Sequence, residues 1–455
     1  MTTFASPELP GIRRSDFPPD FRWGCSTSSY QIEGAIHEGG RGESIWDRFC
    51  RTPRHIRDGS SGAVACDHYH RWPQDLDLAR DLGVNAYRFS IAWPRVFPQG
   101  RGERPNEAGL AFYDRLVDGM LERGLEPWAT LYHWDLPQAL QEAHGGWASR
   151  DTVAAFLEYT DAVTRRLGDR IKHWITHNEP WCTAFLGHHE GNHAPGIMNY
   201  RTALQVCHHL LLSHGLAVPQ IRANVAGAQV GITLSLHPIF PASDSLADQA
   251  AAMRHDGSRN RWFLDPLYGR HYPADVVARL GDLAPIVQRG DFEAMAAPTD
   301  FLGVNYYFPE VVADAPGHGP LATQVVEQPG VERTAFGWPV SPQGMVDLLT
   351  RIQRDWAPAR VYLTENGSTY DDVVLPDGRI EDTQRRSYLE RHLAAARQAR
   401  DAGVPLEGYF AWSLLDNFEW AEGYVRRFGL THVDYTTQRR TLKASGRWYA
   451  GFLAG

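Results

Sequence analysis

Eight short runs of apolar and β-prone residues recur along the chain, separated by more polar stretches. Several are apolar at nearly every position, as expected for strands buried on both faces of a parallel sheet. The runs are FRWGCST (21–27), VNAYRFSI (84–91), EPWATLYHW (126–134), KHWITHN (172–178), VGITLSL (230–236), DFLGVNYY (300–307), RVYLTEN (360–366) and LEGYFAWSLL (406–415). The pattern predicts a strand at each of these runs.

Helical periodicity lies between most of the runs. Residues 106–123 place apolar side chains on one face of a helix that stops at Gly124. The side chains on that face are Leu110, Tyr113, Leu116, Val117, Met120 and Leu121. Residues 149–167 and 383–402 show helical patterns of the same kind, each followed by a glycine. Strands and helices therefore alternate along most of the chain.

This alternation predicts an α/β protein with a closed parallel sheet, a (β/α)₈ TIM barrel. An open, doubly wound sheet is the main alternative, but no GxGxxG motif follows the first strand. Segments 35–75, 237–299 and 308–343 are interpreted as extended βα loops. The length of 455 residues would by itself suggest two or three domains. Because barrels with insertions can be this long, we predict a single catalytic domain over residues 1–455.

Composition and charge narrow the class of protein. The chain is 43% hydrophobic and 22% charged, which is typical of a soluble globular protein. Its net charge of −9 provides no basic surface for nucleic acid or acidic lipid. Five scattered cysteines without a CxxC pair favour buried free thiols over a disulfide framework or a zinc ribbon.

The location expected from the sequence is the cytoplasm. The N-terminal segment MTTFASPELPGIRRSDF has no apolar core of signal-peptide length, and no run is long enough to span a bilayer. Free thiols also fit a reducing compartment. Neither a nucleic acid nor a membrane is expected as a partner, and the oligomeric state, monomer or homo-oligomer, stays open.

Polar and aromatic residues gather at the ends of the predicted strands. Catalytic groups in such barrels come from the C-terminal ends of the strands, and strands chosen for stability alone would not need these residue types there. In strand order they are Gln31, Arg88, His133 and Trp134, Asn178 and Glu179, Asn305 with Tyr306 and Tyr307, Glu365 and Asn366, then Trp412, Asn417, Glu419 and Trp420.

Two of these residues, Glu179 and Glu365, end the fourth and seventh strands and would face each other across the barrel mouth. Cleavage of a glycosidic bond needs such a pair: one carboxyl protonates the leaving oxygen, and the other attacks the anomeric carbon or activates water. The separation of the carboxyls decides between the two outcomes, and the sequence does not give it. Each glutamate alone could equally be a solvated or helix-capping residue.

At this point the sequence resembles glycoside hydrolase family 1, the β-glucosidase family, over nearly its whole length. The motifs that carry the resemblance, in family order, are FRWGCSTSSYQIEGA (21–35), CDHYHRW (66–72), RFSIAWPR (88–95), YHWDLPQAL (132–140), NEP (178–180), HAPG (193–196), GVNYY (303–307), TENG (364–367) and SLLDNFEWAEGY (413–424). The fold implied by the resemblance is a (β/α)₈ barrel, in agreement with the strand pattern.

The resemblance implies a retaining hydrolase that needs no cofactor. Glu179 would be the acid/base and Glu365 the nucleophile, with Arg88 and Tyr307 as partners of the nucleophile and Asn305 as a hydrogen-bonding residue near it. The implied ligands of the sugar are Gln31, His133, Trp134, Asn178, Trp412, Glu419 and Trp420. Trp338 resembles the wall on the leaving-group side, although the family more often has GWEVYP where this chain has GWPVSP.

The substrate implied is an unphosphorylated β-D-glucoside or a related small-molecule glycoside. Glu419 and Trp420 stand where the 6-phosphoglycosidase branch has a different loop, and Glu179 stands where the thioglucosidase branch has glutamine. Glucose, galactose and fucose are not distinguished by these residues. Two alternatives stay open. One is an enzyme that mainly transfers the glycosyl unit to an acceptor other than water. The other is a non-catalytic relative that uses the barrel as a carbohydrate- or protein-binding module, which the loss of either glutamate would favour.

Histidines raise two further questions. The segment HHEGNH (188–193) with His208 and His209 lacks the HExxH spacing, so no metal site is expected. His177 replaces the aromatic residue that usually precedes NEP in the family. On strict strand alternation it would share a face with Glu179. It is either a packed neutral histidine or a group that shifts the acid limb of the pH profile.

Overall fold

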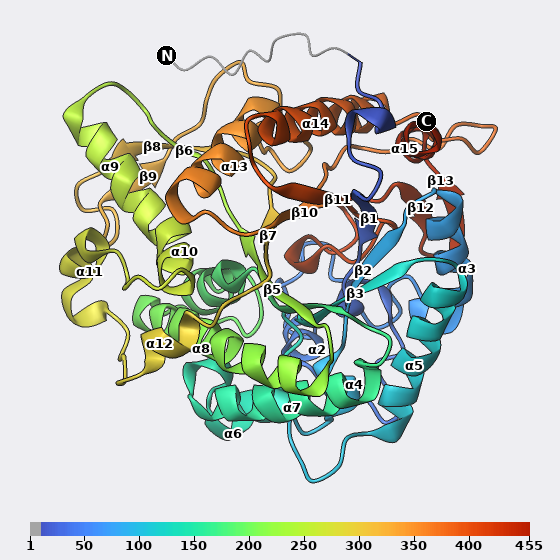
Figure 1. The fold of residues 1–455 in the computed structure, drawn as a ribbon, viewed down its shortest axis with the longest axis horizontal. Coiled ribbons are helices and arrows are strands. Elements are labelled where there is room, and N and C mark those ends of the chain that lie inside the picture. The colour runs from blue at the N-terminus through green and yellow to red at the C-terminus, as the bar shows by residue number, and fades with distance from the viewer. Residues whose placement is uncertain (1–10) are drawn as a thin grey trace.

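The computed structural model describes residues 11–455, and eight of its strands close into a parallel barrel (Figure 1). The closed order is β1-β11-β10-β7-β5-β4-β3-β2, so each strand pairs with its neighbours along the chain and β11 returns to β1. The barrel strands are β1 (Arg22–Ser26), β2 (Ala86–Ser90), β3 (Glu126–Tyr132), β4 (His173–Asn178), β5 (Gln229–Ser235), β7 (Phe301–Asn305), β10 (Val361–Asn366) and β11 (Leu406–Trp412). All eight predicted strands are confirmed.

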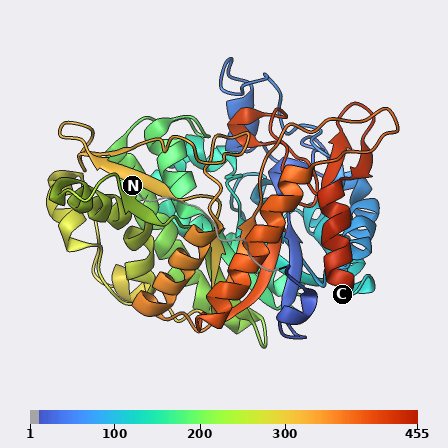
Figure 2. The ribbon, with the colours of Figure 1, turned by 90° about the horizontal axis from the view of Figure 1, so that it is seen from above.

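Helices surround the barrel and cover its outer face (Figures 1 and 2). The predicted helices are found as α5 (Glu107–Glu122), α7 (Asp151–Leu167) and α14 (Thr383–Asp401). The remaining α-helices are α1 (Ser29–Ile32), α2 (Ile45–Cys50), α3 (His68–Asp81), α4 (Trp93–Val96), α6 (Gln138–His144), α8 (Tyr200–Asn224), α9 (Leu246–Asp256), α10 (Trp262–Leu267), α11 (Ala274–Leu280), α12 (Asp291–Met295), α13 (Pro342–Trp356) and α15 (Ala444–Ala454). Two π-helical segments, η3 (Cys182–Glu190) and η4 (Gly257–Arg261), contribute to the barrel mouth.

The long insertions contain structure that the strand pattern did not predict. Strands β6 (Ile239–Pro241), β8 (Glu310–Asp314) and β9 (Thr323–Val325) form a separate small sheet that packs against α9. Strands β12 (Thr431–Asp434) and β13 (Arg439–Leu442) form an antiparallel hairpin before α15. These strands have three to five residues each, which is too short for a clear alternation of apolar and polar positions.

Aromatic side chains fill the lower interior of the barrel. The ring of Trp128 lies 4.7–5.4 Å from the rings of Phe301, Tyr362 and Phe410, each from a different strand. Glycines on neighbouring strands make room for these rings, since a Cβ on Gly24 would lie 2.2 Å from Phe410. The packed interior supports the barrel mouth from below, as in other TIM barrels.

His177 belongs to the packing outside the barrel. Its side chain is fully buried, its ring stacks on Phe156 of α7 with centroids 4.6 Å apart, and its Nε2 lies 2.8 Å from Ser213 Oγ. The register of β4 against β5 shifts between Ile175 and Asn178, so alternation fails at the strand end. The expectation from strict alternation, that His177 shares a face of the strand with Glu179, is therefore wrong.

A buried ion-pair network fixes the loop that follows β11. Lys443, one of only two lysines in the chain, is fully buried, and its Nζ lies 2.5 Å from Asp372 Oδ2 and 2.6 Å from Asp416 Oδ1. Arg427 pairs with Asp416 at 2.7 Å, and Arg385 pairs with Asp372 at 2.9 Å. The network joins the segments after β10, after β11 and before α15.

Within residues 11–455 no helix is long and apolar enough to cross a membrane. The absence of a signal peptide was predicted partly from residues 1–10, which lie outside the described residues. The cytoplasmic location and the single domain over residues 1–455 remain predictions.

Substitution of Gly24 by alanine should destabilise the barrel. The new methyl group would overlap the Phe410 ring in a closely packed interior, and overpacking of this kind costs about 1–3 kcal/mol. Gly451→Ala is the matched control, because nothing lies within 4 Å of its added Cβ in α15. The free energy of unfolding from denaturant titration should fall for Gly24→Ala and stay level or rise for Gly451→Ala. Equal stability of the two variants would contradict this account.

Candidate active site

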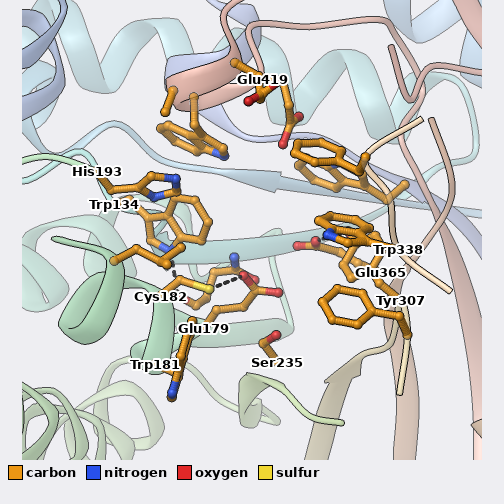
Figure 3. A pocket seen from close by; sticks show the side chains of 18 of the residues that line it. Trp134, Glu179, Trp181, Cys182, His193, Ser235, Tyr307, Trp338, Glu365 and Glu419 are labelled. Atoms are coloured by element: carbon orange, nitrogen blue, oxygen red, sulfur yellow. Dashed lines mark hydrogen bonds between the residues drawn. The ribbon is translucent and has the colours of Figure 1, made fainter. Parts of the chain in front are cut away.

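A cavity of about 360 Å³ opens at the C-terminal end of the barrel, within the size range of small-molecule sites (Figure 3). Most of the residues predicted from the strand ends line it. These are His133, Trp134, Asn178, Glu179, Tyr307, Glu365, Trp412, Glu419 and Trp420, and Trp338, which the family resemblance implies, also lines the cavity. Gln31, Arg88 and Asn305 are fully buried behind this lining and act on it through hydrogen bonds.

Glu365 ends β10 and lies across the cavity from Glu179 (Figure 3). Its Oε1 accepts a hydrogen bond from Arg88 Nη1 at 2.6 Å, and its Oε2 accepts one from the Tyr307 hydroxyl at 2.7 Å. Burial raises the pKa of Glu365 to about 7, with Arg88 opposing this shift and the Glu179 carboxyl reinforcing it. Glu365 and Glu179 thus form a pair of carboxyls that line the same cavity. Because both oxygens of Glu365 accept from donors, the negative charge of the pair belongs there.

Glu179 follows β4 in an uncommon backbone conformation. Its φ of +48° lies in the left-handed region, which costs about 1–2 kcal/mol for a residue with a side chain. Its Oε1 accepts from Asn305 Nδ2 at 2.8 Å, and its Oε2 lies 3.2 Å from the Cys182 thiol. Trp134 and Trp420, which also line the cavity, share positive φ values of 77° and 48°. Three of the ten described residues other than glycine with positive φ thus line the cavity, and strained backbone of this kind is common at functional sites.

The side chain of Asn305 bonds to Glu179, the glutamate that faces the nucleophile candidate Glu365. Its side-chain amide donates to Glu179 and to Asn178 Oδ1, and its own oxygen accepts from Thr364 Oγ1 at 2.8 Å. The backbone of Asn305 pairs with Glu365 in the barrel, which explains why the motif places the two side by side.

Arg88 also determines the protonation state of His133, through hydrogen bonds that Asn178 makes to both residues. Arg88 Nη2 donates to Asn178 Oδ1 at 2.7 Å, so the Asn178 Nδ2 group must point the other way, to His133 Nε2 at 3.1 Å. His133 Nε2 therefore accepts, and the ring is neutral with its proton on Nδ1. Burial and the Arg88 charge lower the pKa of His133 well below its usual value, in agreement with this assignment.

Glu419 carries a third buried carboxyl into the cavity. Gln31 Nε2 donates to Glu419 Oε2 at 3.3 Å, to Asn417 Oδ1 at 3.0 Å and to the Phe418 carbonyl at 3.0 Å. Burial, together with the charges of Glu365 and Glu179, raises the pKa of Glu419 well above its usual value. Gln31 therefore holds the loop that presents Glu419.

Aromatic rings form two walls. Trp412 and Trp420 each lie 5.9 Å from the His133 ring, nearly parallel to it, and Trp134 lies 4.6 Å from Trp420. On the other wall Trp338 stacks between Phe336 at 4.4 Å and Phe308 at 4.9 Å. Amphipathic and aromatic surfaces of this kind suit the apolar faces of a sugar or an aryl group.

Several lining residues were not singled out from the sequence. These include Trp181, Cys182, His193, Ser235, His237, Arg259, Phe308, Glu310, Phe336 and Phe428. Cys182 could have been found from the sequence, because side chains three residues apart meet where the chain is helical, and Cys182 comes three residues after Glu179. Arg259 and Phe336 lie in long insertions where no periodicity indicates which side chains reach the cavity.

Nothing in residues 11–455 gathers three or more histidine, cysteine or acidic side chains in the arrangement of a metal site. The His188 side chain lies against the Thr183 carbonyl, and His208 is bonded to Asp291 and Tyr272. These contacts account for two of the five histidines that the sequence analysis considered as metal ligands.

Comparison with known proteins agrees with this geometry. The family model for glycosyl hydrolase family 1 matches residues 13–454. The chain is 45% identical to beta-glucosidase A of Acetivibrio thermocellus over 439 residues, covering 95% of this chain and 97% of the relative. It is also 45% identical to the beta-glucosidase of an Agrobacterium species, covering 98% of this chain and 97% of the relative.

Solved structures show the same fold. A family 1 β-glucosidase from Thermotoga maritima superimposes with a TM-score of 0.94 at 43% identity, covering 98% of this chain and 99% of the other. That enzyme has also been solved in complex with deoxynojirimycin and with glucoimidazole. With a whole-length family match, close relatives and a common barrel, this chain belongs to glycosyl hydrolase family 1.

Proposed function

We propose that this chain is a retaining β-glucosidase that hydrolyses terminal β-D-glucosyl residues of unphosphorylated O-glycosides. The observation that carries the proposal is the asymmetry of the two facing carboxyls. Glu365 accepts from a guanidinium and a phenol, which stabilise a carboxylate, whereas Glu179 contacts an uncharged amide and a thiol. One carboxyl is thus prepared as a nucleophile and the other as a proton donor.

In the first step, Glu365 attacks the anomeric carbon while Glu179 donates its proton to the departing glycosidic oxygen. The bond to the leaving group breaks, and a covalent glycosyl ester forms on Glu365. The hydrogen bonds from Tyr307 and Arg88 to Glu365 weaken in this step, because the carboxylate of Glu365 loses its negative charge when the ester forms. Asn305 keeps the Glu179 carboxyl directed at the leaving oxygen throughout.

In the second step, Glu179 is a carboxylate and accepts a proton from water as the water attacks the anomeric carbon. Glu365 leaves as a carboxylate, again stabilised by Arg88 and Tyr307, and the configuration of the sugar is retained. Walls of buried aromatic residues limit access of bulk water during this step. The reaction uses the same two side chains twice and needs no further group.

Recognition of the sugar is assigned to the wall opposite Trp338. Asn178, His133 and Glu419 present hydrogen-bonding groups there, and Trp412 and Trp420 provide flat apolar surfaces. A site built to pair with sugar hydroxyls strongly rejects analogues that lack them. Glucosyl is proposed as the preferred unit because the curated relatives named above are β-glucosidases. Galactosyl and fucosyl units and transfer to other acceptors remain secondary candidates.

The proposal is tested by removal of the nucleophile. The native protein should cleave p-nitrophenyl β-D-glucoside and cellobiose, and Glu365→Ala should lose this activity by several orders of magnitude. Azide should restore cleavage of the aryl glucoside by attack from the face that Glu365 vacates, giving an α-glucosyl azide that proton NMR identifies. Recovery of only the β-azide would reverse the assigned roles. A native protein that is inactive on a panel of p-nitrophenyl β-glycosides would refute the function itself.

The hydroxyl of Tyr307 should set the acid limb of the pH profile. It donates to the Glu365 carboxylate, so Tyr307→Phe removes a group that favours ionisation and raises the pKa of Glu365. The ionised nucleophile is then lost at a higher pH as the solution is acidified, and the acid limb of kcat/KM moves to higher pH. Tyr306→Phe is the control, because its hydroxyl donates to the Ser341 carbonyl away from the cavity. An acid limb at the same pH in Tyr307→Phe and Tyr306→Phe would contradict the role of the Tyr307 hydroxyl in setting this limb.

His177 should have no effect on that profile. Burial lowers the pKa of His177 well below its usual value, so the ring stays neutral over the working pH range. It packs against Phe156 and does not line the cavity. His177→Phe should leave both limbs of the kcat/KM profile unchanged, whatever it does to stability. A shift of the acid limb in His177→Phe would instead support the alternative from the sequence analysis, that His177 influences the pH profile.

A further inference from the structure

Arg259 forms part of the cavity wall, although no step of the proposed reaction uses it. It lies in the π-helical segment η4, within the insertion between β5 and β7, and its side chain is only about 5% exposed. Of the described residues that line the cavity, it is the only arginine or lysine. The same lining contains five glutamates, Glu179, Glu310, Glu365, Glu419 and Glu422.

The orientation of the Arg259 guanidinium is fixed from two sides. Its central carbon lies 3.4 Å from the ring centroid of Trp181, which in turn stacks on Phe185. Its Nη2 lies 2.5 Å from His237 Nε2. Burial lowers the pKa of His237 to about 3, so this ring is neutral and accepts the hydrogen bond. A cation held in this way is preorganised, and its fork of donors keeps one direction.

Two donors of this guanidinium are left over. Within the described part of the chain, the buried Nε and Nη1 of Arg259 have no hydrogen-bond partner. Glu310 Oε1 lies 3.9 Å from Nε, beyond hydrogen-bond distance, and Glu310 Oε2 is bonded to His255 Nε2 at 2.9 Å. Buried donors on a charged group carry a large penalty when unpaired. They therefore point to an acceptor that a ligand supplies.

Arg259 lies on the side of the cavity from which the leaving group departs. Its neighbours there, Trp181 and Cys182, come two and three residues after Glu179, and the Cys182 thiol donates to Glu179 Oε2. In the proposed reaction Glu179 gives its proton to the glycosidic oxygen. A ligand group that reaches Arg259 would thus belong to the aglycone, the part of the substrate beyond that oxygen.

The adjoining wall favours a flat aromatic aglycone. The His237 ring, which accepts from Arg259, lies 4.5 Å from Phe308, and Phe308 continues into the stack of Trp338 and Phe336. An aryl ring placed along this wall can extend its far substituent to the guanidinium. An anion close to the glycosidic oxygen would instead be repelled by Glu179 and Glu365, so a favourable anion must lie at the far end of the aglycone.

We propose that Arg259 makes this enzyme selective for β-glucosides of aromatic acids, with the aryl ring on the Phe308–Trp338 wall and a distal carboxylate on the guanidinium. The inference rests on the proposed β-glucosidase activity and specifies its substrate class. A carboxylate accepts stronger, charge-assisted hydrogen bonds from a guanidinium than a neutral hydroxyl does.

The test compares two substrates that differ only in this charge, the β-glucosides of 4-hydroxybenzoate and of its methyl ester. The ratio of kcat/KM for the acid to kcat/KM for the ester should fall at least about tenfold in Arg259→Met, the scale of a lost hydrogen bond to a charged group. Differences in leaving-group ability cancel, because the same two substrates are used throughout. Arg426→Met is the matched control: Arg426 lies over the Phe336 ring, outside the cavity lining, and its ratio should equal that of the native enzyme.

A measurement on the native enzyme removes dependence on the variant's folding. Free 4-hydroxybenzoate should inhibit hydrolysis of p-nitrophenyl β-D-glucoside more strongly than its methyl ester does. An unchanged ratio in Arg259→Met, or equal inhibition by the two phenols, would overturn the inference while leaving the hydrolysis of neutral glucosides intact. Inactivity of the native enzyme on every β-glucoside would instead refute the proposed function, and this inference with it.

Discussion

The buried guanidinium of Arg88 is the interaction on which the site depends. A fully buried cation in the barrel must be neutralised and hydrogen-bonded, and Arg88 meets this requirement with Glu365, the Thr364 carbonyl and Asn178. These contacts join β2, β10 and β4 at their C-terminal ends. The demand for neutralisation thus also determines the charge of Glu365, the proposed nucleophile, the orientation of Asn178 and the neutral state of His133. Stability and reactivity at the barrel mouth have the same physical origin.

The barrel itself was predictable because its strands obey a strong local rule. Strands such as β5 and β7 are buried on both faces, so they appear in the sequence as continuous apolar runs, and all eight were found within a few residues of their observed ends. The two candidate catalytic glutamates were predictable for a related reason, since a parallel barrel brings every strand end to one rim. Once the barrel was inferred, Glu179 and Glu365 had to lie close together despite their separation along the chain.

The sequence was less informative where tertiary contacts override local pattern. The alternation rule misplaced His177, because the register of β4 shifts before Asn178 and the chain then turns through a left-handed residue. The small sheet of β6, β8 and β9, and with it the position of Arg259, depends on how long insertions fold over the rim. No periodicity in those segments indicates which side chain enters the cavity. The leaving-group side of the site is therefore visible only in three dimensions.

The near absence of lysine has a practical consequence for attachment chemistry. Of the two lysine side chains, Lys443 is fully enclosed in its ion-pair network, whereas Lys172 is partly exposed and its Nζ donates to the Gly168 carbonyl. Lys172 directly precedes β4, so it lies at the N-terminal end of the barrel, opposite the cavity. Reagents that couple to side-chain amines would find a single site on the folded protein. A surface that captures the enzyme through that amine would hold every molecule with its substrate entrance facing the solution.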